Sequence, residues 1–373
     1  MDFSLTEEQE MLKTMARDYL AKNCPKPSAM LKELRNDERG YPPELWKGMA
    51  ELGWMGLALP EKYGGAGGSF LDLIVLLEEM GRACLPGPFF STVLLGGLTI
   101  LEAGTEKQKQ ELLTKVSQGE VILTLALLEP NAKYEPLAVA IKATRNDDDF
   151  VISGTKLFVP NAHVADYIIC AARTTEGITL FLLDTKSPGI ETTVLQTIDW
   201  SKQCAVALNN VKVSKDNILG KLGQGWEIIE RALAKAKIGI CADAVGCTGR
   251  AMEMAIDYAK ERVQFGVRIG TFEVIQHYCA DMAIALEACR WATYKTAWML
   301  SEGKPYAQWV AMTKAFVSTA IQKILFSASH IHGSIGMTID HDMPLYYSRG
   351  KALELTFGSG DENLELVAEQ MGL

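Results

Sequence analysis

Histidines and acidic residues gather in the last third of this 373-residue sequence, and such side chains could bind a metal or move protons. Imidazole and carboxylate groups are frequent zinc ligands and frequent acid or base catalysts. The spacing fits no common zinc pattern, so we predict no metal site. The residues concerned are His330, His332, Asp340, His341 and Asp342.

Three other features could bind phosphate or act as a base. The glycine-rich run at 63–69 lacks the Lys-Ser/Thr of a phosphate-binding loop, and no predicted strand precedes it, so it indicates a turn between helices. Asp361 and Glu362 are typical of the acidic first turn of a helix. Asp243 and Glu230 fall on a long predicted helix, and one sequence does not show which way they face.

Composition excludes several classes of function. The net charge is −9, which gives no general basic field for nucleic acid or an anionic membrane. The eight cysteines form no C-x-x-C pair and favour reduced thiols in a cytoplasmic protein. No signal peptide and no apolar run of about 18 residues are present, so no membrane span is expected.

Periodicity divides the chain into three predicted domains. Residues 1–118 are predicted to be helical, with Thr6 as the cap of the first helix and further helices at 44–52, 70–83, 91–103 and 106–117. Residues 119–222 carry short β-branched runs separated by turns, which predicts a compact barrel or sandwich with strands at 121–127, 138–143, 150–153, 156–159, 167–171, 178–183 and 205–213. Residues 223–373 carry long helical patterns at 226–263, 272–302, 305–330 and 362–371, which predicts an antiparallel bundle.

Three passages in these domains resemble one known family when taken together and in order. They are LPEKYGG at 59–65 with EEMGR at 78–82, YAKERVQFG at 258–266 followed by ADM at 280–282, and IHGSIGMT at 331–338. Weaker matches are EP at 129–130, GTKLFVPN at 154–161 and AMTK at 311–314. The set resembles the acyl-CoA dehydrogenase family along essentially the whole chain.

The resemblance implies an α domain, a β domain and a four-helix bundle, with FAD bound at a subunit interface. It implies α,β-desaturation of an acyl-CoA, in which a glutamate takes the α-proton and the flavin accepts a hydride. Electrons would pass to an electron-transfer flavoprotein. The chain would be a homo-oligomer, a dimer or tetramer, or a hetero-oligomer with a homologous chain.

By resemblance, Arg262, Gln264 and Phe265 would meet the pyrophosphate and adenine end of FAD. The loop that contains His330, His332, Gly333, Ser334 and Gly336 would bring backbone amides to the same end. A guanidinium fork and exposed N–H groups suit phosphate oxygens.

On the flavin-ring side the family's usual donors are replaced. Phe158 occupies the place of a tryptophan, and Pro160 occupies the place of a hydroxyl donor and has no N–H to offer. Backbone amides at Leu127 and Leu128 could still serve the pyrimidine edge of the ring.

The base is the largest departure from the family pattern. Gly358 falls where the glutamate is expected, and the family's other known location reads Ala236-Lys237. Asp361 and Glu362, one turn further on, are the first candidates for a relocated base.

Two hypotheses follow from these losses. The chain is either an active dehydrogenase with a relocated base, or a catalytically incomplete subunit that completes a partner's FAD site. A further alternative is a purely structural or binding protein that holds no flavin. The small residues Gly239, Ala242 and Gly246 would either widen an acyl pocket or serve core packing.

Overall fold

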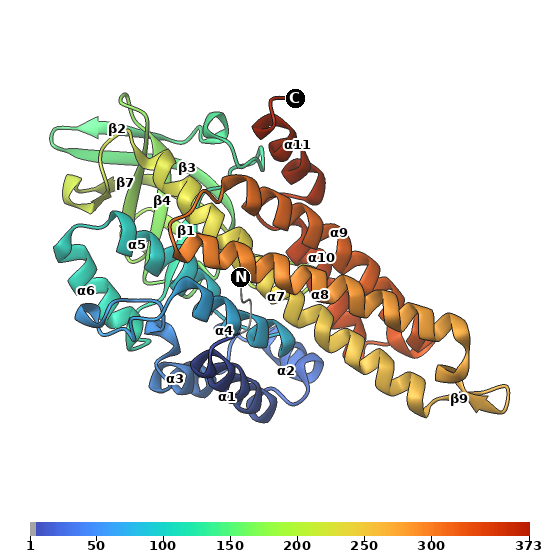
Figure 1. Ribbon diagram of the computed structural model, residues 1–373. Helices are drawn as coiled ribbons and strands as arrows, with labels where there is room; N and C mark the ends of the chain where they lie inside the picture. The colour runs from blue at the N-terminus through green and yellow to red at the C-terminus, as the bar shows by residue number, and fades with distance from the viewer. Residues whose placement is uncertain (1–4) are drawn as a thin grey trace. The chain divides into compact units, whose positions relative to one another are not determined.

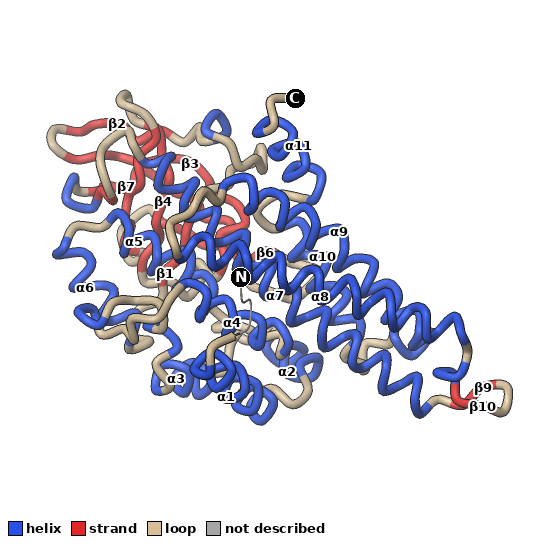
Figure 2. Tube along the Cα trace, in the orientation of Figure 1, coloured by secondary structure: helices blue, strands red, loops and turns tan. Residues whose placement is uncertain are grey.

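The computed structural model describes residues 5–373 and divides them into two compact units. One contains the chain up to Glu33 with Ser69–Leu85 and Lys237–Leu373, and the other contains Leu34–Gly68 and Pro86–Ala236. Along the chain, helices come first, strands second and long helices last (Figures 1 and 2). The predicted fold class is confirmed. The domain boundaries after residues 118 and 222 stay predictions.

The N-terminal helices begin largely where their caps predict. Thr6 accepts the Gln9 N–H at 3.3 Å, and the Gln9 side chain accepts the Thr6 N–H at 3.0 Å, so the predicted cap is confirmed. The segment expected as one helix at 91–103 begins instead with a π-helical stretch, Phe90–Gly97. The helices are α1 (Glu7–Asn23), α2 (Pro27–Leu34), α3 (Pro43–Glu51), α4 (Phe70–Arg82), α5 (Leu98–Ala103) and α6 (Glu106–Ser117).

The middle region forms one mixed sheet in the order β6-β7-β3-β2-β4-β5-β8, with β1 paired parallel to β4. Two runs expected as separate strands form the single long strand β3. Strand β6, at one edge and mostly exposed, was not predicted. The strands are β1 (Leu123–Ala126), β2 (Lys142–Asn146), β3 (Asp149–Pro160), β4 (Tyr167–Arg173), β5 (Ile178–Asp184), β6 (Ile190–Leu195), β7 (Gln203–Val213) and β8 (Ile218–Leu219).

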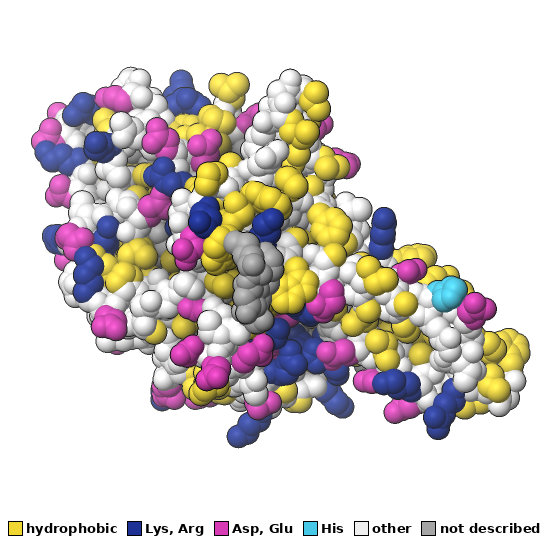
Figure 3. All heavy atoms as spheres, in the orientation of Figure 1, with side chains coloured by type: hydrophobic (Ala, Val, Ile, Leu, Met, Phe, Trp, Pro, Cys, Tyr) yellow, Lys and Arg dark blue, Asp and Glu magenta, His cyan; other side chains and the backbone are white. Residues whose placement is uncertain are grey.

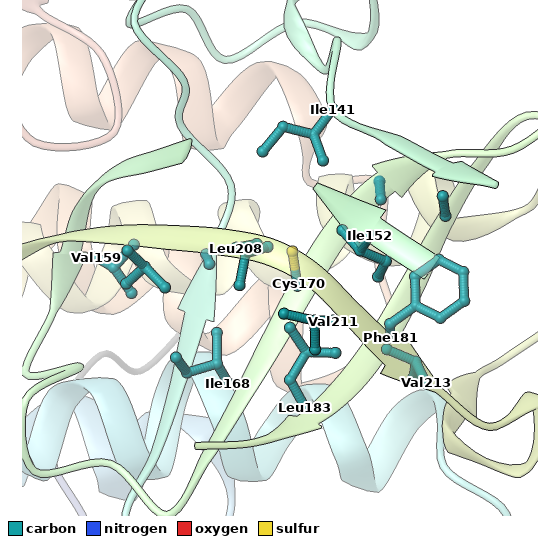
Figure 4. Close-up of a cluster of buried hydrophobic side chains, with 14 of the residues drawn as sticks. Ile141, Ile152, Val159, Ile168, Cys170, Phe181, Leu183, Leu208, Val211 and Val213 are labelled. Atoms are coloured by element: carbon teal, nitrogen blue, oxygen red, sulfur yellow. The ribbon is translucent and has the colours of Figure 1, made fainter. Parts of the chain in front are cut away.

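The core of this sheet is a continuous apolar cluster contributed by six of its strands and by neighbouring turns (Figure 4). Side chains at alternate positions of β3 enter it, beginning with Phe150 and Ile152. The same alternation carries Lys156 inward, and its side chain is 0% exposed. A lysine in such a position requires polar partners inside the domain.

Three of the C-terminal helices, α7, α8 and α9, are long and lie along one another (Figure 1). A small hairpin formed by β9 (Val263–Gln264) and β10 (Val267–Arg268) follows the first of them. Helix α10 was not predicted, because its apolar residues lack a steady helical spacing. Among residues 5–373, no helix is long and apolar enough to cross a membrane. The helices are α7 (Gly225–Glu261), α8 (Glu273–Ser301), α9 (Ala307–His332), α10 (Met343–Leu355) and α11 (Gly360–Gln370).

Helices α4 and α7 cross with their backbones in contact. A Cβ on Gly246 would lie 1.8 Å from the Glu78 carbonyl oxygen, and one on Gly81 would lie 2.1 Å from the Asp243 carbonyl oxygen. Only glycine permits this approach. Of the two roles open for Gly246, the structure therefore supports close packing of helices.

Candidate functional site

The position where the family places its base lies in a tight turn between α10 and α11. Gly358 has a φ of +99°, in the region that residues with a side chain rarely adopt. A Cβ built there would lie 3.1 Å from Nδ2 of the Asn363 side chain. The turn therefore accommodates glycine and opposes any larger residue.

A lysine and an asparagine hold this turn from inside. The Lys237 ammonium donates to Asn363 Oδ1 at 2.8 Å, and Asn363 Nδ2 donates to the carbonyls of Gly358 at 3.2 Å and Ser359 at 2.7 Å. Asn363 is fully buried, and burial lowers the pKa of Lys237. Sequence reasoning noted Lys237 but missed Asn363, because nothing in the sequence reveals a partner 126 positions away.

The two candidate bases lie in the first turn of α11, and both are exposed. The Glu362 carboxylate accepts the Ser359 N–H at 2.7 Å, while Ser359 Oγ accepts the Glu362 N–H at 3.3 Å. This reciprocal pair is a capping box. Glu362 thus has a structural partner, whereas Asp361 points into solvent, and their catalytic assignment stays a prediction.

A second buried lysine lies on the same side of the helical domain. Lys314 Nζ donates to Ser318 Oγ at 3.0 Å and to the carbonyls of Leu353 and Glu354, both at 2.9 Å. Burial lowers its pKa to about 8. Its ammonium satisfies the carbonyls at the end of α10, which have no partner within the helix.

The two acids on α7 have different environments. Asp243 is buried and forms a two-point ion pair with Arg349, at 3.0 Å and 2.6 Å, which fixes α10 against α7. Glu230 is exposed and accepts the indole N–H of Trp226 at 2.8 Å. Neither arrangement leaves an unpaired buried carboxylate.

The residues predicted to bind the adenine and pyrophosphate of FAD lie at the end of α7. Phe265 and Gly266, with φ of +54° and +81°, form the two-residue turn of the β9–β10 hairpin. Phe265 is 93% exposed and contacts only the edge of Phe272 among the aromatic pairs described, with ring centroids 6.2 Å apart. Arg262 and Gln264 precede Phe265 in the chain and are also exposed. A large apolar ring held in a disfavoured backbone conformation at a surface tip indicates a binding role.

The structure brings the predicted glycine loop to this same end of the helical domain. Helix α9 ends at His332, and Gly333 has a φ of +61°. The His332 ring stacks on Tyr258, one turn before Arg262, with centroids 4.8 Å apart. Gly333 and Ser334 are exposed, while Gly336 is buried, with its Cβ position 2.7 Å from His332. The backbone amides of this loop and Arg262 therefore lie at the same end of the helical domain.

The histidines of this region are held by aromatic rings. His330 stacks on Phe326 at 6.0 Å and meets the edge of Tyr278 at 5.8 Å. His332 Nδ1 lies 2.8 Å from the Ala328 carbonyl, and burial lowers its pKa. Among the described residues, no group of three or more His, Cys, Asp or Glu side chains could hold a metal.

The predicted flavin-ring residues lie together in the middle domain. In the β3–β7 pairing, Lys156 faces Val206 and Val159 faces Cys204, so β3 carries one extra residue there. This β-bulge holds Phe158 at φ +52°, with the side chain 49% exposed. Leu157 N–H donates to the Leu128 carbonyl at 2.9 Å, which ties the bulge to the segment that contains Leu127 and Leu128.

Pro160 contributes through its carbonyl, which accepts the Thr124 hydroxyl at 2.6 Å. The middle domain thus offers an exposed aromatic ring beside backbone amides. The helical domain offers a guanidinium, a glycine turn and a second exposed ring. Guanidinium and amide groups suit a pyrophosphate, and aromatic rings suit the two planar ring systems of a dinucleotide. The residues present therefore fit FAD.

Comparison with known proteins agrees with this chemistry. Residues 6–120 match the N-terminal domain of acyl-CoA dehydrogenases, residues 124–211 the middle domain and residues 223–372 the C-terminal domain. The chain belongs to the acyl-CoA dehydrogenase family, whose members are FAD-dependent oxidoreductases.

Three proteins illustrate the likeness. The short-chain specific acyl-CoA dehydrogenase of Clostridium acetobutylicum is 34% identical, and the alignment covers 97% of each chain. The butyryl-CoA dehydrogenase of Megasphaera elsdenii has a TM-score of 0.93 and 29% identity, covering all of both chains. A chain of the ChsE4-ChsE5 complex of Mycobacterium tuberculosis has a TM-score of 0.92 and 25% identity, covering 100% of this chain and 99% of the other.

Proposed function

We propose that this chain takes part in the α,β-desaturation of an acyl-CoA thioester, with electrons passing from FAD to an electron-transfer flavoprotein. Family membership supports the reaction class. When bound, the flavin accepts a hydride from the β-carbon. Within the helical domain, Arg262 and the 330–336 loop suit the dinucleotide end of an FAD, and within the middle domain the Phe158 bulge suits a flavin ring.

Within this reaction, we assign the chain the role of a subunit that completes a partner's FAD site while lacking a base of its own. The observation that carries this assignment is the turn at Gly358. Its positive φ and the nearby Asn363 side chain, which Lys237 holds, disfavour any residue with a carboxylate at the family's position and so support this role. A solved neighbour, the ChsE4-ChsE5 complex, is an assembly of two named chains.

The exposed apolar side chains of the helical domain support assembly with another chain. Hydrophobic surface recurs along helices α8 and α9 (Figure 3). Large apolar surfaces of this kind mark interaction sites. The residues are Val274, Ile284, Trp291, Met312, Phe316 and Phe326.

Purification of the chain alone and together with a homologous chain that carries the glutamate tests this role. We expect a colourless or inactive protein alone and a yellow assembly that acyl-CoA bleaches and that then reduces an electron-transfer flavoprotein. In the assembly, Arg262→Ala should lower the FAD content. A chain that is yellow and bleached by acyl-CoA on its own would instead establish the homo-oligomeric enzyme.

That second function, an active dehydrogenase with a relocated base, rests on Asp361 and Glu362, which lie three and four residues after Gly358. Its own test is the pair of variants Asp361→Asn and Glu362→Gln, measured by acyl-CoA bleaching of the chain alone. Loss of turnover by at least a hundredfold in one variant, with FAD retained, would identify the base.

A further inference from the structure

The middle domain buries an ion pair that the reaction as described above does not use. Lys156 is 0% exposed and Glu129 is 5% exposed, and Lys156 Nζ lies 2.7 Å from Glu129 Oε1. The ammonium also donates to the Leu127 carbonyl at 3.0 Å. A buried ion pair often adds little net stability, because both charges lose their hydration. The contact with Leu127 offers a different reason for its presence.

The partners of Glu129 make the pair a fixed unit. Its carboxylate accepts the N–H of Ala140 at 3.0 Å and of Ile141 at 3.2 Å, in addition to the ammonium. All of these groups lie within the middle domain. The ammonium is therefore oriented by the carboxylate on one side and directed at a single peptide carbonyl on the other.

We propose that Lys156 is a positioning residue for the flavin and acts through the peptide between Leu127 and Leu128; this inference rests on the proposed FAD site. In a trans peptide, the carbonyl of one residue and the N–H of the next point in opposite directions. With its carbonyl held by Lys156, the peptide presents the Leu128 N–H away from the domain interior. Leu157 N–H holds the next carbonyl, that of Leu128, so the segment is fixed at two successive peptides.

The charge of Lys156 also acts on the strength of that donor. A cation on a carbonyl oxygen polarises the peptide and makes its N–H a stronger donor, because hydrogen bonds in a chain reinforce one another. The pyrimidine edge of the flavin gains electron density on reduction, so a stronger donor there favours the reduced form. Lys156 thereby compensates for the hydroxyl donor that Pro160 has replaced.

Two charge-changing variants of the flavin-loaded protein, alone or in its assembly, test this role. Lys156→Met should shift the equilibrium toward oxidised flavin at least tenfold, which is about 30 mV for a two-electron couple. Glu129→Gln should shift it in the opposite direction, because the ammonium then acts without its counter-charge. Lys156→Arg, which keeps the charge, should stay within about twofold. The midpoint potential is measured against reference dyes.

A purely structural role predicts a different pattern. Glu78→Gln, in the helical domain, removes a carboxylate that is equally buried and paired with Arg290 at 3.0 Å. Glu78→Gln is therefore the control: it should lower thermal stability as much as Lys156→Met does, but leave the flavin midpoint potential unchanged. If Lys156 were purely structural, Lys156→Met would behave in the same way. Shifts of the same sign in Lys156→Met and Glu129→Gln, or no shift in either, would overturn the inference.

If Lys156→Met does not fold, Glu129→Gln alone tests the inference. A midpoint potential that does not rise in Glu129→Gln then rejects the positioning role of Lys156. Failure of the proposed function has a separate signature. The unaltered protein would then bind no flavin in any assembly, so that no potential could be measured.

Discussion

Two regions of the helical domain, the β9–β10 hairpin and the turn between α10 and α11, differ in whether their side chains have partners within the chain. At the hairpin, Arg262 and Phe265 extend into solvent, and Phe265 is held in a disfavoured conformation. At the turn between α10 and α11, Lys237 and Asn363 satisfy the loop from within, and Gly358 leaves no side chain to do chemistry. The exposed hairpin supports the proposal that it binds something outside the chain, whereas the polar groups of the turn find their partners within the chain.

The largest expected effect separates these two regions directly. The double change Arg262→Ala and Phe265→Ala should lower FAD affinity of the yellow assembly at least a hundredfold, because it removes a charge-assisted phosphate contact and an aromatic surface. FAD content after gel filtration measures this. Arg268→Ala, an exposed arginine on the other strand of the hairpin, serves as the matched control. Equal losses in both proteins would show that Arg262 has no special role.

The second prediction concerns the missing base. Gly358→Glu should not restore turnover to the chain alone, and Gly358→Ala should lower the free energy of unfolding by about 1–3 kcal/mol, since a side chain at φ +99° is strained. Gly360→Ala is the control, because its Cβ would have ordinary contacts of 3.4 Å or more and its φ is not positive. Acyl-CoA bleaching and chemical denaturation measure the two effects. Recovery of turnover in Gly358→Glu would contradict the closed turn.

The third prediction tests the hydrogen bonds that close the turn. Asn363→Ala leaves the Lys237 ammonium without its acceptor and two carbonyls without their donor, and should lower the free energy of unfolding by about 1–3 kcal/mol. Denaturant titration measures the change. Glu365→Ala, at an exposed position of the same helix, should alter it by no more than about 0.5 kcal/mol. If Asn363→Ala lowered the free energy of unfolding as little as Glu365→Ala, contacts other than those of Asn363 would hold the turn.

The last prediction is a gradual pH dependence due to Lys314, which is small at any pH near neutrality. Its folded pKa of about 8 lies below the ordinary 10.5, so between these pH values the unfolded chain binds more protons than the folded chain. The free energy of unfolding should therefore rise with pH across this window, relative to Lys314→Met, by up to about 1.4 kcal/mol per pH unit. Below pH 8 the difference should be flat. A difference that is constant from pH 8 to 10.5 would place the pKa at its ordinary value.

Local patterns predicted most of the fold. Capping residues such as Thr6 and β-branched runs such as that of β4 act over a few residues, and both were read correctly from the sequence. Helix α10 was missed because tertiary contacts, such as the Arg349–Asp243 pair, fix it in place of a regular apolar stripe. Edge strand β6 was missed although four of its six residues are β-branched, and its pairing with β7 fixes it in the structure.

The candidate site was predictable only where motifs carry it. The sequence pointed to Arg262, which lies in the 258–266 passage, and to Gly358, which stands where the resemblance places a glutamate; both assignments stay predictions. It did not reveal Asn363, Lys314 or Lys156, whose roles depend on partners far along the chain. Lys156 did leave one signal, a cation at an inward position of an alternating strand, which predicts a buried partner without identifying it.

The exposed ring of Phe265 has a consequence for how the protein is made in a cell. A newly folded copy that has met neither cofactor nor companion displays this ring on a projecting tip, where chaperones and proteases recognise apolar surface. Its lifetime then depends on how quickly the tip is covered. We expect the amount of this polypeptide that accumulates to follow the supply of riboflavin and the synthesis of its companion, even when its own messenger level is constant.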